Sequence, residues 1–232
     1  MSIWSRIGDF LSSVTTQALS SAVESLRTVF AGDPLTRRQV AFSIAIIALS
    51  AKMAKADGVV TDSEVVAFRE LFEISPDDAT HVARLYNLAK QDVVGFEAYA
   101  GQIKKLFPED DDILEDVMDG LFHIAKADGV VHELAIEFIE RIAEIFGMGV
   151  RDFERIRLRH LAPPSGDPYL VLGASSQWAD DKLKRHYREL LKEYHPDRMI
   201  SRGVPPEFLK IANDRMATIN EAWGHIKAER GF

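Results

Sequence analysis

A heptapeptide that occurs twice constrains the fold of this chain more than any other feature of its sequence. The run Ala-Lys-Ala-Asp-Gly-Val-Val fills residues 54–60 and returns at residues 125–131. Each copy lies between two apolar segments with helical spacing, at 42–53 and 65–72 for the first copy and at 113–124 and 134–146 for the second. Two helices joined by a short turn form an αα-hairpin. The repeat therefore predicts two related hairpins that pack into one all-α bundle with an internal two-fold repeat.

The turn inside the repeat is open to two interpretations. Gly58 and Gly129 can adopt the left-handed conformation that ends a helix, and a short polar side chain such as Asp57 or Asp128 is common beside such a glycine. The same carboxylates also offer the oxygen ligands that hard divalent cations prefer. The two valines that follow each glycine supply no side-chain oxygen, so the repeat contains no complete calcium-binding loop.

The tripeptide His195-Pro196-Asp197 lies between two amphipathic patterns near the C-terminus, at residues 179–194 and 206–222. In both patterns the apolar residues recur at spacings of three and four, which predicts two helices with one apolar stripe each. The two stripes are expected to face each other and consist of Leu183, Tyr187, Leu190 or Leu191 and Tyr194 on the first helix, and of Phe208, Ile211, Ala212, Met216, Ile219 and Trp223 on the second. The pattern predicts an antiparallel helical hairpin with the tripeptide in the loop at its tip.

The side of residues 179–194 that is expected to be exposed is basic. We call it the basic face, and it consists of Lys184, Arg185, Arg188 and Lys192. Arg198 continues it after the tripeptide, whereas Glu189 and Glu193 dilute it. Such a row of charges is either an ordinary solvated helix face or a docking surface for an acidic partner.

Three short runs accompany the tripeptide in a fixed order. Asp-Pro-Tyr-Leu-Val-Leu-Gly fills residues 167–173, Lys-Glu-Tyr fills residues 192–194, and Ile-Asn-Glu-Ala-Trp fills residues 219–223. With the tripeptide between them, residues 167–232 resemble the J-domain of the DnaJ co-chaperones. The resemblance implies a DnaK-type chaperone ATPase as the partner, whose ATP hydrolysis the protein stimulates without catalysing a reaction itself.

The same resemblance assigns roles to the residues of the tip. His195 and Asp197 are expected to make the decisive polar contacts with the ATPase, Pro196 to fix the turn, and Arg198 and the basic face to support docking. The enzymatic alternative is not favoured, because side chains on either side of a proline are not expected to pair as a base and its orienting carboxylate. One departure concerns Ala179, which stands where the family has a capping Ser or Thr.

Residues 35–160, with their repeated turn, are similar to the TerB-like domain that precedes the J-domain in DjlA-type proteins. In that family the acidic residues of the repeated turn are considered as metal ligands. The resemblance puts Asp57 and Glu64 of the first copy and Asp128 of the second copy in this role, with either a divalent metal or no cofactor at all. The rival to the co-chaperone function is therefore an ion-binding or stress-sensing helical module, placed at a membrane, in which the J-domain is secondary.

The two ends of the bundle complete the expected division of the chain. Residues 1–34 hold an amphipathic helix that either docks on its own domain or on a second subunit as a homodimer, or makes peripheral membrane contact through residues 1–30. Residues 161–166, Leu-Ala-Pro-Pro-Ser-Gly, form a linker because its two prolines forbid a continuous helix. The J-domain then spans residues 167–232.

The composition excludes several other classes of protein. Residues 1–164 hold 17 Lys/Arg and 26 Asp/Glu, and an acidic surface of this kind argues against binding nucleic acid. Cysteine is absent, which excludes disulfides and thiolate metal sites. No segment is apolar over the roughly 20 residues that a membrane-spanning helix needs, and no secretory signal is apparent. We therefore expect a cytoplasmic protein, which would reach a membrane only at its inner face.

Overall fold

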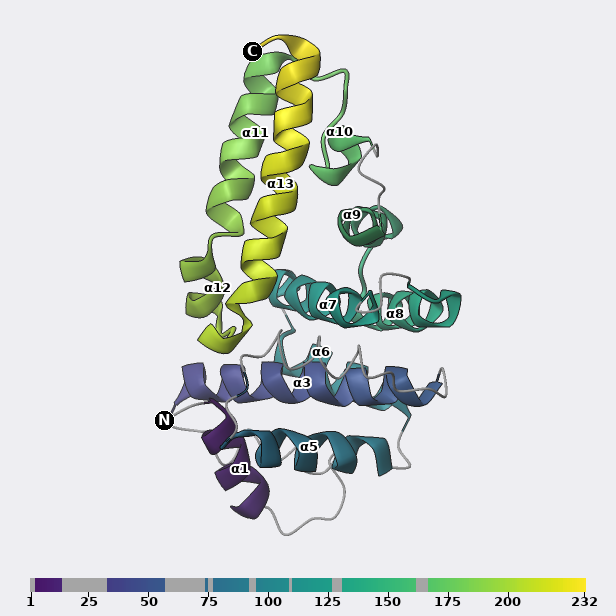
Figure 1. Ribbon diagram of the computed structural model, residues 1–232, viewed down its shortest axis with the longest axis vertical. Helices are drawn as coiled ribbons and strands as arrows, with labels where there is room; N and C mark the ends of the chain where they lie inside the picture. Colours follow the sequence, from purple (N-terminus) through teal and green to yellow (C-terminus); the bar gives the residue numbers. More distant parts are fainter. Residues whose placement is uncertain are drawn as a thin grey trace.

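The computed structural model describes residues 3–13, 33–56, 74, 77–91, 95–108, 110–126, 131–161 and 167–232. Within these ranges the regular structure is helical throughout and contains no strand, which confirms the predicted all-α class. A helical hairpin stands upright on a layered bundle, with the C-terminus at its far end (Figure 1). The described bundle helices are α1 (Ile3–Ser13), α3 (Pro34–Ala56), α5 (Ala79–Gln91), α6 (Phe96–Leu106), α7 (Asp111–Ala125), α8 (Glu133–Phe146) and α9 (Val150–Leu161).

The helix α3 is the centre of the lower part of the bundle and packs against α1, α5, α6, α7 and α8. It begins at Pro34, whose fixed φ suits the first position of a helix, and the Asp33 carboxylate caps it by accepting the Thr36 N–H at 3.0 Å. From Val40 to Ala54 almost every side chain is buried, as expected of a helix that is covered on all sides.

The helix α7 forms a second central layer between α3 and the upright hairpin (Figure 1). Asp110 caps its first turn by accepting the Ile113 N–H at 3.4 Å, and the carboxylates that follow favour the positive end of the helix dipole. Gly120 allows a close approach, because a Cβ at this position would lie 2.7 Å from the Ile46 Cδ1 of α3 and 3.3 Å from the Ile211 Cδ1 of the hairpin. Three helices therefore meet at this point of α7.

Three of the four helices predicted around the repeated turn lie in the described part of the chain. α3 covers the apolar segment before the first turn, and α7 and α8 cover the segments on both sides of the second, as predicted. Asp57, Glu64 and Asp128, the three expected metal ligands, lie outside the described residues, as does the segment expected to follow the first turn.

The hairpin consists of α10 (Pro168–Val171), α11 (Asp180–Glu193), α12 (Pro196–Arg202), the 3₁₀ turn η1 (Pro206–Phe208) and α13 (Leu209–Arg230). α11 and α13 run side by side in opposite directions (Figure 1), and the Tyr187 and Trp223 rings stack with centroids 4.6 Å apart. Leu183, Leu190 and Ile219 are buried between the helices. The predicted antiparallel pair is confirmed.

The lower end of the hairpin differs from the prediction. Phe208, Ile211 and Ala212 were expected to face α11, but they belong to the core of the bundle, together with Met199 and Val204. The Phe208 ring lies 5.0 Å from Phe42 of α3 and 5.8 Å from Trp4 of α1, measured between centroids. The physical reason is length: α13 extends past the end of α11, so its first turns lie against α7 instead.

Candidate functional site

The tripeptide at the tip starts a helix and is not part of an open loop, which corrects the sequence prediction. His195 is the N-cap of α12, and its Nδ1 accepts the Asp197 N–H at 3.2 Å. Pro196 occupies the first helical position, where the missing N–H costs nothing. Gly203, with a φ of 108°, ends this helix after two turns. The tip is therefore an ordered helix start.

Both polar side chains of the tip are exposed. The side chains of His195 and Asp197 are 55% and 87% exposed, and the His195 Nδ1 lies 3.7 Å from the Asp197 Oδ2. The N-cap geometry brings the two groups near each other, but no hydrogen bond joins their side chains. The separation is too long for a hydrogen bond, so both groups keep capacity for a partner molecule.

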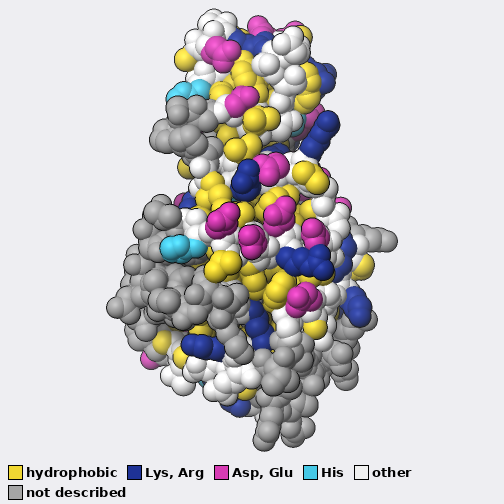
Figure 2. All heavy atoms as spheres, turned by 90° about the vertical axis from the view of Figure 1, so that its right-hand side faces the viewer, with side chains coloured by type: hydrophobic (Ala, Val, Ile, Leu, Met, Phe, Trp, Pro, Cys, Tyr) yellow, Lys and Arg dark blue, Asp and Glu magenta, His cyan; other side chains and the backbone are white. Residues whose placement is uncertain are grey.

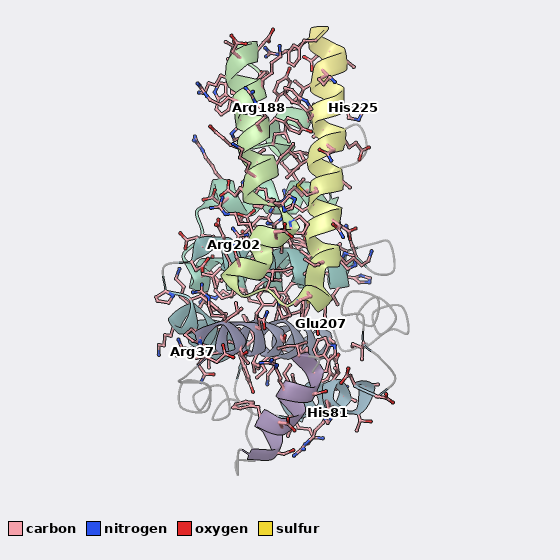
Figure 3. The ribbon with its side chains drawn as sticks, turned by 90° about the vertical axis from the view of Figure 1, so that its left-hand side faces the viewer. Arg37, His81, Arg188, Arg202, Glu207 and His225 are labelled. Atoms are coloured by element: carbon pink, nitrogen blue, oxygen red, sulfur yellow. The ribbon has the colours of Figure 1, made fainter. Side chains whose placement is uncertain are left out.

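The basic face lies on the exposed side of α11, the helix on which Figure 3 labels Arg188. Arg185, Arg188 and Lys192 are exposed at helical spacing, and Arg198 is exposed on α12. Lys184 differs from the others: it is half-buried, with its ammonium 4.2 Å from the centroid of the Phe232 ring. Three cations of α11 and one of α12 thus remain open to solvent beside the tip.

The start of α11 is held by a residue from the last turn of α13, which lies at the same end of the hairpin. Ala179 provides no side-chain cap, because its methyl group cannot accept a hydrogen bond. Arg230 compensates by donating to the Trp178 carbonyl at 2.9 Å and to the Asp180 carboxylate at 2.8 Å. It also donates to the Tyr169 hydroxyl at 2.8 Å, so one guanidinium links α10, α11 and α13.

Beneath the tip, a buried ionic cluster joins the hairpin to the bundle. We define it as the carboxylates of Glu115, Asp116 and Asp119 on α7 together with the guanidinium groups of Arg155 and Arg159 on α9, Arg202 on α12 and Arg215 on α13. All three carboxylates are buried, and Asp116 is fully enclosed. Because ions without partners are very costly in such a place, each carboxylate needs its guanidinium neighbours.

Distances within the ionic cluster show how the two parts of the molecule are paired. On the bundle side, the Glu115 oxygens lie 2.8 Å from Arg155 and 2.6 Å from Arg159. On the hairpin side, Arg215 lies 2.8 Å from an Asp116 oxygen and also pairs with Asp119. Arg202, at the junction visible in Figure 3, lies 3.5 Å from Asp116 and 2.6 Å from Asp112 at the start of α7. α7 therefore supplies the anionic surface for both α9 and the hairpin.

The charges of this region set the ionisation of its groups. Burial alone would raise the pKa of Glu115, but the guanidinium groups of Arg159, Arg215 and Arg155 outweigh it and hold the pKa well below its ordinary value. Burial, with Lys126 and Arg159 nearby, lowers the pKa of His160 well below its ordinary value. The neutral His160 ring donates its Nε2–H to the Asp119 carboxylate, 2.7 Å away.

The sequence reasoning missed the ionic cluster, although a signal was present. Three acidic residues, Glu115, Asp116 and Asp119, interrupt the apolar segment at residues 113–124. Arg155 and Arg159 are spaced by four on α9 and so share a helix face. Carboxylates within an apolar helix indicate buried partners, because charged groups are almost never fully buried alone.

The N-terminal helix uses its apolar face within the protein. Ile3, Trp4, Ile7 and Phe10 of α1 are at most 4% exposed and belong to the bundle core. The Ile3 N–H donates to the Glu207 carboxylate at 3.1 Å, so α1 also contacts the base of the hairpin. While α1 stays docked, this face is closed to a membrane and to a second subunit. Among the described helices, none has the length and apolar character needed to cross a bilayer.

Metal ligation can be assessed only for the described parts of the chain. There, no group of three or more His, Asp or Glu side chains is arranged to hold a metal ion. Figure 2 shows acidic side chains gathered on the face that α8 and α9 present, where Glu133, Glu137, Glu140 and Glu144 are exposed. This distribution agrees with the acidic character predicted for the bundle.

The fold and the tip together define a class of protein: an all-α bundle that carries a DnaJ-type hairpin at its C-terminal end. The family model described as tellurite resistance protein TerB matches residues 43–158, half of the chain, and the DnaJ domain model matches residues 167–229. The chain belongs to the TerB family and continues into a DnaJ domain.

Comparison with curated proteins confirms the DjlA-type arrangement. The co-chaperone protein DjlA of Photobacterium profundum is 26% identical over 221 residues, which cover 84% of this chain and 80% of the relative. DjlA of Coxiella burnetii is 27% identical over 200 residues (78% and 74%), and DjlA of Vibrio cholerae is 25% identical over 237 residues (88% and 84%). No solved structure matches the chain significantly.

Proposed function

We propose that this protein is a cytoplasmic co-chaperone that binds a DnaK-type chaperone ATPase and stimulates its ATP hydrolysis. The observation that carries the proposal is the exposed pair of His195 and Asp197 at the start of α12, together with three exposed cations on α11, the helix that leads into the tip. The DnaJ domain match and the names of the relatives support the same function. The chain itself performs no bond chemistry in this proposal.

The charges of α11 suit the first stage of such an encounter. Arg185, Arg188 and Lys192 form one exposed stripe, and a stripe of like charges steers an acidic surface and raises the association rate. These contacts form with either conformation of the ATPase, so on their own they change affinity and not the hydrolysis rate.

Stimulation requires contacts that favour the hydrolysis-competent conformation over the resting one. A hundredfold stimulation corresponds to roughly 2.7 kcal/mol of differential stabilisation, which a few charge-assisted hydrogen bonds provide. We assign these contacts to His195 and Asp197, whose side chains are exposed at the tip, with Pro196 and Arg198 in supporting roles. The bundle, residues 35–160 in the predicted division, is proposed to target or regulate this activity.

The test is single-turnover ATP hydrolysis by a DnaK-type chaperone in the presence of the full chain and of its His195→Gln variant. The wild type is expected to accelerate hydrolysis, and the variant is expected to lose the acceleration because it lacks the imidazole at the tip. His225→Gln is the matched control: His225 is exposed on α13, far up the hairpin from the tip (Figure 3), and this variant should act like the wild type.

Two results would contradict the proposal. The first is a folded wild-type chain that stimulates none of several DnaK-type chaperones. The second is equal stimulation by the wild type and by His195→Gln, which would show that any acceleration comes from contacts elsewhere. Circular dichroism of each variant establishes that its helices are intact before the activities are compared.

A further inference from the structure

Tyr194, the residue directly before the tip, is held by the bundle and not only by the hairpin. Its hydroxyl donates to the Glu115 Oε1 of α7 at 3.1 Å and accepts from the Arg155 Nη1 of α9 at 2.9 Å. Two guanidinium groups lie over its ring, those of Arg159 and Arg215, at 5.7 Å and 4.4 Å from the ring centroid. Cations at such distances over an aromatic face attract it. The side chain is 3% exposed, so these contacts are shielded from water.

The chain on the other side of the tip is anchored to the same bundle helix. Met199, two residues after Asp197, is fully buried in the bundle core. Arg202, in the last turn of α12, lies 2.6 Å from the Asp112 carboxylate of α7. The tip is therefore a short exposed segment, and each of its flanks is attached to α7 through buried or half-buried contacts.

We propose that Tyr194 is a positioning residue through which Glu115 and Arg155 of the bundle orient His195 and Asp197. The inference rests on the proposed function, because orientation matters only if the tip contacts an ATPase. It goes beyond that function by giving the bundle a direct part in activation, in addition to targeting.

The geometry favours presentation of the tip over its concealment. A bundle that masked the tip would bury His195 and Asp197, yet both are exposed while Tyr194 beside them is not. A group that is already held in its bound orientation loses less entropy when it binds. Fixing Tyr194 thus lowers the cost of the contacts that favour hydrolysis, whereas the stripe of α11 cations that governs the encounter is unaffected.

The variant Tyr194→Phe removes only the hydroxyl. The ring and its two guanidinium contacts remain, and Glu115 keeps Arg155 and Arg159 as partners, so no buried charge is left alone. In single-turnover ATP hydrolysis titrated with the full chain, we expect the maximal stimulated rate to fall about fivefold. This change corresponds to about 1 kcal/mol. The half-saturating concentration should stay at the wild-type value.

Tyr187→Phe is the matched control on the same helix. The Tyr187 hydroxyl donates to the Asn220 Oδ1 at 2.9 Å, but this bond lies within the hairpin, two turns away from the tip. The Tyr187→Phe variant therefore loses the same hydroxyl group and a similar hydrogen bond, while every contact between hairpin and bundle stays in place. We expect this variant to have the wild-type maximal stimulated rate and the wild-type half-saturating concentration.

A second readout reports on the tip without any ATPase. The amides of Asp197, Arg198 and Met199 bond to His195 at the start of α12, so they are protected while the tip is ordered. Hydrogen exchange of these amides should become faster in Tyr194→Phe and stay unchanged in Tyr187→Phe. A purely structural role for the hydroxyl would instead raise exchange throughout the hairpin.

The outcomes separate this inference from the proposed function. A lower maximal rate with faster exchange at the tip supports both. Wild-type activity and wild-type exchange in Tyr194→Phe overturn the positioning role alone, and so does a change confined to the half-saturating concentration. If the wild type stimulates no ATPase, the proposed function fails, and the exchange measurement still decides whether Tyr194 fixes the tip.

Discussion

At the scale of single residues, we expect the ionic cluster to be the most sensitive to substitution within the described part of the chain. Asp119 contacts Arg159, Arg215 and His160 while only 1% exposed. The attraction between buried ions is offset by the cost of removing them from water, so such a cluster adds little net stability while it is complete. Losing one member is different, because its partners are left as uncompensated buried charges.

We expect Asp119→Asn to lower the free energy of unfolding by about 3–5 kcal/mol, the cost of breaking a buried ion pair. The amide is similar in shape, so the change acts through the lost charge and not through a cavity. Urea unfolding followed by circular dichroism measures it. Glu154→Gln is the control: Glu154 pairs with Arg157 on the surface at 2.9 Å, and its loss should cost less than about 1 kcal/mol. Equal effects in the two variants would show that the cluster is not buried in solution.

At the scale of elements, the start of α11 depends on α13. Arg230→Gln removes the contacts to Trp178 and Asp180 that replace a conventional cap. We expect faster amide hydrogen exchange in the first turns of α11, with exchange at the tip unchanged because the lower end of the hairpin is anchored separately. The neighbouring cation Lys227 is exposed, and Lys227→Gln should leave α11 as protected as in the wild type. Protection that is equal in both variants would contradict this role of Arg230.

The helices themselves were largely predictable, and the exception is instructive. Strong apolar periodicity placed α7, α8 and α11 within a few residues of their observed ends. α13 was expected to end near residue 222 but continues to Arg230. Gly224 lowers helix propensity by about 1 kcal/mol, yet it is exposed and meets no neighbour, while the buried Trp223 and Ile226 on either side of it stabilise the helix. Packing therefore outweighed local preference.

The candidate site was predictable only in part, for a related reason. The tripeptide and the basic face are local features, so the sequence alone located His195, Asp197 and Arg188. The contacts of Tyr194 with Glu115 and Arg155 join residues that are far apart in the chain, and no local pattern specifies which helices meet. The same holds for Phe208, whose apolar character correctly predicted burial, while the expected partner helix α11 was wrong because Phe208 packs against Phe42 and Trp4.

At the scale of the whole molecule, the junction of hairpin and bundle contains a half-buried histidine, His123. The His123 Nδ1 of α7 lies 3.2 Å from the Asp214 carboxylate of α13. Burial lowers the pKa of His123 to about 4; Asp214 opposes this shift, while Lys126, Lys210 and His160 contribute to it. The ordinary value in an unfolded chain is about 6.5. Between these values the unfolded chain binds a proton that the folded protein does not.

We therefore expect stability to be independent of this group above about pH 6.5 and to fall as the pH drops from there toward 4. His160, whose pKa is also lowered, acts in the same direction. Urea unfolding at pH 7.5, 6.5 and 5.5 measures the slope. His123→Gln should make the loss between pH 6.5 and 5.5 smaller, whereas His225→Gln, at an exposed position, should retain the wild-type dependence. A slope unaffected by His123→Gln would rule out this origin.

The packing of Phe208 against Trp4 and Phe42 also bears on how the chain is synthesised. A ribosome synthesises the chain from the N-terminus to the C-terminus. The residues of the bundle are therefore made before the C-terminal residues that complete its core. Synthesis of residues 199–232 at bacterial or eukaryotic rates takes roughly 2–7 s. During that time the nascent bundle exposes apolar surface that the finished protein covers with Met199, Val204 and Phe208. For those seconds, the chain itself is an incompletely folded polypeptide of the kind that chaperones protect from aggregation.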